Sequence, residues 1–267
     1  SSGGVEALGL LLPALPARLR AAVLVVLHLP PDRPSLLSNI FANACALPVK
    51  EAEDKEDVQP GVVYFAPPDY HLLVDQGRAA FIDTGTHFAV PRLLATLDDL
   101  GLARDAVDWV IPTHVHLDHA GGVGSLVREL PSARVLVHPR GLRHLLDPSA
   151  LWRGALAVYG DAEMARSYGE VVAVDAARAT ATHDGLAIEV GERRLVFADT
   201  PGHALHHHCV WDERSAGWFT GDTFGLSYRE CDSVVGAWAM PTSSPVQFEP
   251  DELRQSIARL RAKLRTW

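Results

Sequence analysis

The sequence predicts an α/β protein. Over residues 1–77, patterns typical of helices alternate with short strands rich in valine and leucine. From residue 78 onward one arrangement recurs: an apolar strand ends in a short loop that carries histidine or aspartate, and a helix or another strand follows. Four segments have this form, namely "FIDTG", "WVIPTHVHLDH", "LVFADTPGH" and "WFTGD". Sheets that alternate with helices in this way are typical of α/β domains.

The front part of the chain is predicted to contain, in order, a helix, a strand and a second helix, at Val5–Leu15, Ala22–Leu27 and Arg33–Ala46. The strand holds "AAVLVVL", an apolar run that is too short to cross a bilayer and is typical of a buried parallel strand. Prolines and arginines interrupt the wider apolar stretch and no basic segment precedes it, so we do not expect a signal peptide. Two short strands that form a pair are expected next, at Val62–Phe65 and His71–Asp75.

A β-hairpin is predicted where "HLLVD" and "AAFID" flank the link of Gln76, Gly77 and Arg78, because glycine suits a tight turn. Near the end of the chain, leucine and isoleucine recur at helical spacing. This pattern predicts a terminal amphipathic helix on which one face carries Leu253, Ile257, Leu260 and Leu264.

Composition limits the classes of function. The chain of 267 residues is 48% hydrophobic and 21% charged, which is ordinary for a soluble globular protein with one large domain or two modest ones. Its net charge of -9 includes no block of lysines and arginines, so neither nucleic acid nor a membrane is an expected partner. Three widely separated cysteines, Cys45, Cys209 and Cys231, argue against a disulfide framework and favour a reducing cytoplasm.

The segment "THVHLDHAGG" concentrates metal-binding side chains. His114 and His116 are two residues apart and project to the same side of an extended segment, while Asp118 and His119 can turn toward a neighbouring position. Imidazole nitrogens and carboxylate oxygens are zinc ligands, and a catalytic site keeps a position open for water. One short loop therefore has the donors for two adjacent metals.

Two later residues extend this site. His203 and Asp222 each follow an apolar strand, so both are expected at the same edge of the sheet, where α/β proteins bind ligands. Two metals roughly 3.5 to 4 Å apart would hold a hydroxide between them and polarise a carbonyl or phosphoryl oxygen. No serine or cysteine nucleophile is needed for such a reaction.

These motifs resemble those of the metallo-β-lactamase-fold hydrolases, and the resemblance extends from about residue 78 to the C-terminus. It implies an αββα sandwich with two zinc ions at one edge. It also implies roles: the first zinc is held by His114, His116 and His203, the second by Asp118 and His119, and Asp222 bridges the two. Asp83 in "FIDTG" matches an early aspartate of that family that orients a ligand histidine.

The chain departs from that family in one respect. Relatives usually supply a further histidine to the second metal, whereas here no histidine follows His208 and the chain stops at Trp267. We therefore expect a domain that is truncated at its C-terminus, a second site one ligand short, and about one metal per chain. His207 is expected to be the polar start of the strand "HHCVW" rather than a substitute ligand, and His138 is not expected to be a ligand.

The front of the chain has a different resemblance. The segments "SSGGVEALGLLLPALP", "VLVVLHLPP", "VKEAED" and "QPGVVYFAPPDYHLLV" resemble, in that order, the catalytic domain of CheB-type chemotaxis protein-glutamate methylesterases. Ser1 and His28 match that family's serine nucleophile and its histidine base. No counterpart of the family's aspartate is found, so a structural role is expected here. The resemblance implies a partial Rossmann-like α/β segment at 1–77, joined to the hydrolase domain at 78–267.

Three functions remain open. The first is a metal-dependent hydrolase that cleaves an ester, thioester, lactone or lactam of a small-molecule substrate by zinc-bound hydroxide, with Asp118 managing a proton and with iron or manganese as alternative metals. The second is a CheB-type serine esterase that acts on a chemotaxis receptor. The third is a chimeric or truncated chain with little or no catalysis. The loops Leu142–Tyr168 and Ser227–Ser244 are expected to line the cleft, and their aromatic residues indicate a partly apolar ligand: Trp152, Tyr159, Tyr228 and Trp238.

Overall fold

The structure is a computed structural model that describes residues 23–25, 41–42, 45–51, 59, 62–65, 72–225, 243–244 and 247–264. The chain divides into two compact units, which are described separately. The front unit comprises residues 1–70 with 225–240, and the main unit comprises residues 71–224 with 241–267. Among the described helices, none is long and apolar enough to span a membrane.

The front unit contains a small parallel sheet. Its order is β1-β3-β2, with strands Val23–Val25, Val63–Phe65 and Val49–Glu51. Because β3 pairs with β1 and β2, the predicted pairing of this strand with residues 71–75 is wrong. The helix predicted over Arg33–Ala46 is also too long, since Cys45 and Ala46 are not helical. The helix predicted over residues 5–15 lies outside the described residues.

A five-stranded sheet forms one half of the main unit. Its order is β4-β5-β6-β7-β8, and the strands are Leu72–Asp75, Arg78–Ile82, Val107–Ile111, Arg134–Val137 and Ala179–Ala181. The β4–β5 pair is the predicted antiparallel hairpin, and the other pairs are parallel. Gln76 and Gly77 have φ of 47° and 73° in its turn, as a two-residue turn between twisted strands requires. The predicted boundary at 77/78 falls inside this hairpin.

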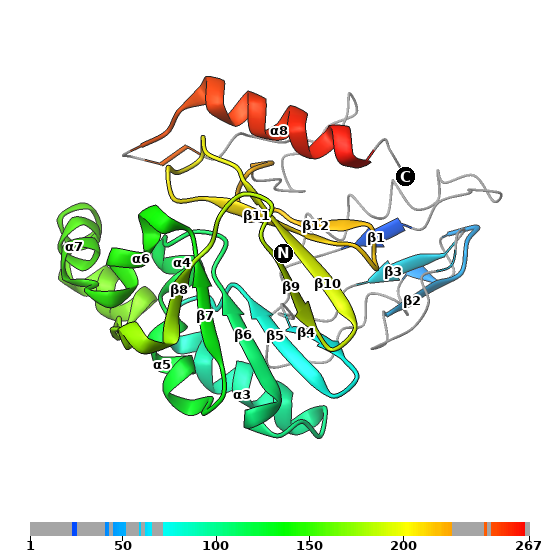
Figure 1. Ribbon diagram of the computed structural model, residues 1–267, viewed down its shortest axis with the longest axis horizontal. Helices are drawn as coiled ribbons and strands as arrows, with labels where there is room; N and C mark the ends of the chain where they lie inside the picture. The colour runs from blue at the N-terminus through cyan, green and yellow to red at the C-terminus, as the bar shows by residue number, and fades with distance from the viewer. Residues whose placement is uncertain are drawn as a thin grey trace. The chain divides into compact units, whose positions relative to one another are not determined.

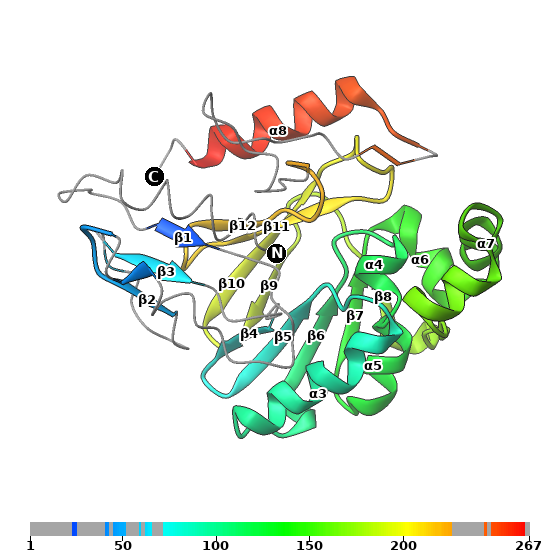
Figure 2. The ribbon, with the colours of Figure 1, turned by 180° about the vertical axis from the view of Figure 1, so that it is seen from behind.

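Helices cover the outer face of this sheet (Figure 1, Figure 2). Leu97 and Leu126, from two of these helices, are fully buried against Phe81 and Val110 of the strands. The α-helices between β5 and β8 are α3 Val90–Asp99, α4 Leu117–Ala120, α5 Val123–Glu129, α6 Pro139–Leu146 and α7 Ser149–Glu163. Short helical turns occur at η2 His87–Ala89, η3 Arg104–Ala106, η4 Met164–Tyr168 and η5 Ala176–Arg178.

An antiparallel four-stranded sheet forms the other half of the main unit. Its order is β12-β11-β10-β9, with strands Gly217–Phe219, His208–Asp212, Arg193–Asp199 and Ala187–Val190. The predicted terminal helix is α8, Pro250–Leu264, which covers the outer face of this sheet (Figure 1). Its Leu260 packs against Ala198 and Cys209.

The two sheets of the main unit pack face to face. Ile82, Ile111 and Leu136 of the five-stranded sheet contact Phe197 and Val210 of the four-stranded sheet, and all five side chains are buried. Alternate side chains of strand β10 face opposite sides of its sheet. Phe197 faces the other sheet, while its neighbour Ala198 faces α8. Helices outside and two sheets inside form the predicted αββα sandwich.

Candidate metal centre

The polar loops at the ends of four strands lie close together at one edge of the sandwich. Asp83 follows β5, His114 and His116 follow β6, His203 follows β10, and Asp222 follows β12. Because the two sheets face each other, these strand ends meet although the residues lie far apart in the sequence. The loop after β6 continues into α4, which carries Asp118 and His119.

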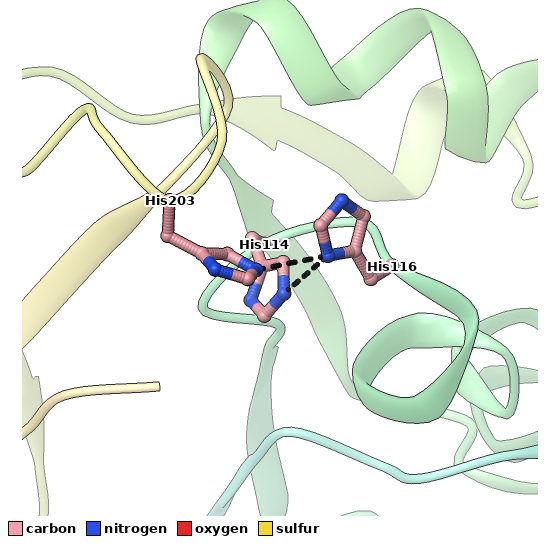
Figure 3. A group of neighbouring side chains, drawn as sticks. All are labelled: His114, His116 and His203. Carbon is pink, nitrogen blue, oxygen red and sulfur yellow. Dashed lines mark hydrogen bonds between the residues drawn. The ribbon is translucent and has the colours of Figure 1, made fainter. Parts of the chain in front are cut away.

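Three imidazoles converge on one point (Figure 3). The Nε2 atom of His114 lies 2.9 Å from Nδ1 of His116, and Nε2 of His203 lies 3.1 Å from the same Nδ1 atom. His114 is fully buried and His203 is 3% exposed, whereas His116 is partly open to solvent. One ligand atom from each ring therefore faces a space that a single cation could share. This donor set fits zinc, which takes imidazole nitrogens.

The first two of these rings are neutral. Burial and the neighbouring histidines hold the pKa of His114 well below its ordinary value. Burial, followed by the nearby His203, lowers the pKa of His116 to about 4. A neutral imidazole keeps a nitrogen lone pair, which is the form that binds a metal.

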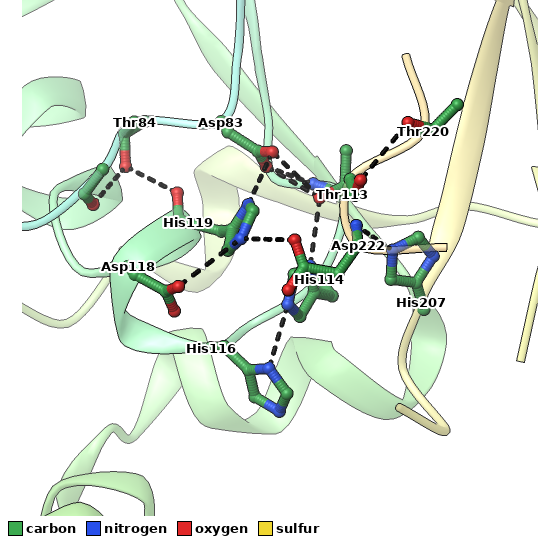
Figure 4. Close-up of polar contacts among 12 residues, drawn as sticks. Asp83, Thr84, Thr113, His114, His116, Asp118, His119, His207, Thr220 and Asp222 are labelled. Carbon is green, nitrogen blue, oxygen red and sulfur yellow. Dashed lines mark hydrogen bonds and ion pairs between the residues drawn. The ribbon is translucent and has the colours of Figure 1, made fainter. Parts of the chain in front are cut away.

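His119 lies among three carboxylates (Figure 4). Its Nε2 atom is 3.1 Å from Oδ1 of Asp222 and 3.6 Å from Oδ2 of Asp118, and its Nδ1 atom is 2.8 Å from Oδ2 of Asp83. Burial alone would lower the pKa of His119, but the hydrogen bonds to Asp222 and Asp83 outweigh it and raise this pKa to about 11. Positive charge is thus strongly favoured at this position.

Asp222 connects the two groups of ligands. Its Oδ1 atom faces His119, and its Oδ2 atom is 3.5 Å from Nε2 of His203. Burial opposes the ionised form of Asp222, yet the hydrogen bond from His119 keeps its pKa below the ordinary value. A carboxylate placed between two donor groups in this way is suited to bridge two cations.

Asp83 orients the centre from behind. Its Oδ1 atom accepts a 2.6 Å hydrogen bond from the backbone N–H of Thr113, and its two oxygens lie 3.0 Å from the Thr113 hydroxyl. Its bond to Nδ1 of His119 leaves Nε2 of that ring facing the carboxylates. The Thr113 hydroxyl is also 3.1 Å from Nδ1 of His114, so Thr113 orients a second ring. Asp83 has a φ of 58°, a conformation that aspartate tolerates better than most residues.

Two glycines allow the loops to approach so closely. A Cβ atom at Gly202 would lie 2.3 Å from the backbone nitrogen of Leu253, and a Cβ atom at Gly221 would lie 2.5 Å from the Thr113 hydroxyl. Both glycines also have positive φ, at 133° and 46°. The sequence "TPGH" therefore positions His203 through its glycine, and "TGD" positions Asp222 in the same way.

His207 has both ring nitrogens engaged by the protein. Its Nδ1 atom is 3.0 Å from the Thr200 hydroxyl, and its Nε2 atom accepts a 3.3 Å hydrogen bond from the backbone N–H of Asp222. Strand β11 begins one residue later, at His208. His207 thus supports the Asp222 loop, a role that sequence reasoning missed because no local pattern links residues 207 and 222.

Other predicted residues lie elsewhere. His138 is engaged away from the centre: its Nε2 atom is 3.1 Å from Oδ1 of Asp199, and its Nδ1 atom accepts from the backbone N–H of Arg140. Trp152 and Tyr159 lie on α7, partly or largely exposed. Four further predicted residues lie outside the described residues, namely Ser1, His28, Tyr228 and Trp238.

Comparison with known proteins identifies the family. A family model described as metallo-beta-lactamase superfamily matches residues 64–265. The chain belongs to this superfamily. An archaeal metallo-beta-lactamase superfamily protein from Sulfolobus tokodaii is 24% identical, with a TM-score of 0.54 over 70% of this chain and 67% of that one. A metallo-beta-lactamase family protein from Thermus thermophilus is 26% identical, with a TM-score of 0.50 over 72% and 64% of the two chains. These matches confirm the predicted fold class of this chain, an α/β protein with a metallo-β-lactamase-like αββα sandwich.

The second predicted resemblance is also confirmed. A model described as CheB methylesterase matches residues 1–115, which reaches beyond the predicted segment. A protein-glutamate methylesterase/protein-glutamine glutaminase from Thermotoga maritima is 44% identical over 113 residues, 42% of this chain and 30% of that protein. A relative from Leptospira interrogans is 30% identical over 126 residues, 46% of this chain and 65% of its own length. The chain thus spans less than two thirds of these relatives.

Proposed function

We propose that this chain is a metal-dependent hydrolase that cleaves an ester, thioester, lactone or lactam bond of a small molecule with water activated by zinc. The convergence of His114, His116 and His203 carries the proposal, because three imidazole nitrogens within a cation's reach have no comparable use in packing. Membership of the metallo-beta-lactamase superfamily supports it independently. Both observations favour metal-assisted hydrolysis over a serine nucleophile.

The residues of the centre would have different roles in hydrolysis. A zinc ion bound there lowers the pKa of water and polarises the substrate carbonyl. Asp222 would bridge the two metal positions and Asp83 would hold His119 in place. Asp118 is the more accessible carboxylate, with a side chain 64% exposed, so it would exchange a proton with the reacting groups and with solvent.

The two metal positions would differ in affinity. The first has three imidazole donors, two of them buried. The second has the imidazole of His119 with the carboxylates of Asp118 and Asp222, and it shares His114, which has a ligand atom within 4.8 Å of those of His119 and Asp222. More nitrogen donors and greater burial favour zinc at the first position, so about one metal per chain would be retained through purification. Iron or manganese would suit the oxygen-rich second position better than the first.

Metal content and hydrolysis measured together test this function. The purified chain should contain zinc, iron or manganese, hydrolyse at least one member of a panel of aryl ester, thioester, lactone and β-lactam substrates, and lose that activity to a chelator. His116→Ala should abolish both metal and activity. His183→Ala is the matched control, because His183 is exposed and its imidazole hydrogen-bonds only the Asp184 carbonyl among the described groups. A metal-free chain, or activity untouched by chelator, would refute the proposal.

A serine esterase of the CheB type is the second candidate, favoured by the 44% identity over 113 residues with the Thermotoga protein. In this case Ser1 and His28 would act on methylated glutamate of a chemotaxis receptor. Hydrolysis that resists the chelator and disappears in Ser1→Ala would support this candidate. Hydrolysis that survives in Ser1→Ala would exclude it. A chain that shows neither chelator-sensitive nor Ser1-dependent hydrolysis would match the third function considered above, a chimeric or truncated chain with little or no catalysis.

A further inference from the structure

A basic cavity lies next to the candidate metal centre. It has a volume of about 400 Å³ and is lined by Arg140, Arg143, His144, His206 and Gln247, among others. The ring of His206 is in edge-to-face contact with that of His116, with 5.3 Å between centroids. A group bound in the cavity would thus be one side chain away from the proposed metal ligands.

No described residue neutralises the positive charge in the cavity. Arg140 and Arg143 are three residues apart on α6, so they lie on the same side of that helix, and both are exposed. Within the described part of the chain, neither forms an ion pair, and no carboxylate lines the cavity. Arg143 is held in place by a 3.2 Å hydrogen bond from its Nε to Nε2 of His144. Pro139 of α6 also lines the cavity, and the backbone N–H groups of the next three residues are bonded to His138 rather than open to a ligand.

His206 adds a buried donor. The side chain is 7% exposed, and its Nδ1 atom lies 3.4 Å from the backbone N–H of Val115, which donates to it. An imidazole that accepts at Nδ1 carries its proton on Nε2. Among the described residues, nothing accepts a hydrogen bond from this Nε2 atom. Because His206 lines the cavity, this N–H is available to a group bound there.

We propose that this cavity binds an oxyanion of the substrate, a carboxylate or a phosphate, and thereby selects anionic esters or thioesters for hydrolysis. Two guanidinium groups and an imidazole N–H are groups that proteins use to bind such oxygens. The cavity has room for a small oxyanion and part of its carbon chain, while the scissile bond would extend toward His116. This inference rests on the proposed hydrolase function for the identity of the reaction, but not for the binding.

Anion binding by the purified chain tests the cavity without turnover. Calorimetric titrations with inorganic phosphate and with succinate distinguish the two oxyanions. Arg140→Ala/Arg143→Ala should bind the preferred anion about tenfold more weakly or worse, the scale expected for charge-assisted hydrogen bonds. Arg261→Ala is the control, since it removes an exposed arginine from α8. Metal content is measured in each sample. Absence of binding by the natural chain, or equal binding by all three proteins, would overturn the inference.

A pair of substrates tests selection. The 4-nitrophenyl monoester of succinate should have a KM about tenfold or more below that of neutral 4-nitrophenyl pentanoate. The double arginine variant and His206→Phe should lose this preference, whereas His206→Gln, which keeps an N–H donor, should retain part of it. Equal KM values with chelator-sensitive hydrolysis would defeat the cavity proposal and leave the hydrolase standing. Arginine-dependent anion binding without any hydrolysis would support the cavity proposal and refute the hydrolase function.

Discussion

Replacing Asp83 by asparagine should weaken the second metal position while leaving the fold intact. The asparagine side chain has nearly the same shape, and asparagine tolerates the observed φ of 58° as well as aspartate does. In the natural chain Oδ1 of this carboxylate accepts from the backbone N–H of Thr113 and Oδ2 faces Nδ1 of His119, with the Thr113 hydroxyl in contact with both oxygens. The single amide oxygen of asparagine can face only one of these two residues, so its NH₂ group must face the other.

The size of the effect follows from that mismatch. If the NH₂ group faces His119, it favours the tautomer whose proton is on Nε2, where the metal should bind. If the NH₂ group faces Thr113, two hydrogen-bond donors face each other and the backbone N–H of Thr113 loses its acceptor. Loss of a group that orients a metal ligand typically lowers metal affinity 10- to 100-fold, or about 1.4 to 2.8 kcal/mol. The first position should change less, because no hydrogen bond links Asp83 directly to His114, His116 or His203 among the described contacts.

Zinc titration against a chromophoric chelator measures both affinities in one experiment. Asp199→Asn is the control, because Asp199 also contacts a histidine, His138, but away from the centre. Its two zinc affinities should match those of the natural chain. If Asp83→Asn also keeps both affinities within a factor of about two, then Asp83 does not orient His119 for metal binding.

Three further outcomes test the fold around the centre. Gly202→Ala should lower stability by about 2 kcal/mol or more, because its Cβ would overlap the Leu253 backbone; a thermal melt like that of the natural chain would contradict this. Phe197→Ala should lower the free energy of unfolding, measured by urea denaturation, by about 3 to 5 kcal/mol, because Phe197 is buried. The control Phe88→Ala, at an exposed position, should lower it by less than about 0.5 kcal/mol, and equal denaturation midpoints for the two variants would contradict this. Burial raises the pKa of Cys209 to about 11, so at pH 8 roughly one thiol in a thousand is ionised; iodoacetamide should modify it only in the denatured chain, as read by peptide mass spectrometry.

The sequence predicted correctly those elements that have a clear turn residue or a regular spacing of apolar residues. The β4–β5 hairpin was predictable because Gly77 supplies the turn, and α8 because its leucines recur at helical spacing. The pairing of β3 was not predictable in this way. Its short apolar sequence suits any parallel or antiparallel neighbour, and the choice depends on contacts with β1 and β2 that lie outside its own sequence.

The candidate site was predictable to a similar degree. Residue types and strand ends indicated which side chains belong to it, since imidazole and carboxylate groups are concentrated after apolar strands. The groups behind them left no such signal. Thr113 orients His114 through its hydroxyl, and Nε2 of His206 has no described partner, but nothing in the sequence distinguishes this threonine or this histidine from others. Such roles depend on which loops meet, which only the three-dimensional structure gives.

The overlap of the two family matches has a physical basis in the hairpin. The CheB methylesterase model extends to residue 115 and the metallo-beta-lactamase model begins at residue 64, so both include β4 and β5. A strand, a glycine turn and a return strand satisfy either pattern. In the structure, β5 pairs with β6, whose end leads into the loop that carries His114 and His116.

His207 provides the sharpest test of whether loop support, rather than ligand chemistry alone, sets the position of Asp222. Its Nε2 atom accepts from the Asp222 backbone while Nδ1 contacts Thr200, so the ring cannot also bind a metal without losing one of these bonds. His207→Leu removes the acceptor of the Asp222 backbone N–H, while the Thr200 hydroxyl keeps its bond to Sγ of Cys209, so the change should cost about 1 to 3 kcal/mol. His207→Gln, which can still accept from Asp222, should cost less.

Metal titration separates this role from that of a ligand. If His207 supports the loop, zinc affinity at the second position should fall in the leucine variant and recover in the glutamine variant. A ligand role predicts a different result: both variants would lose the imidazole and bind the second zinc equally poorly, even where urea denaturation shows that the glutamine variant is stable. Because glutamine can replace the hydrogen bond but not a zinc–imidazole bond, recovery can come only from the position of Asp222.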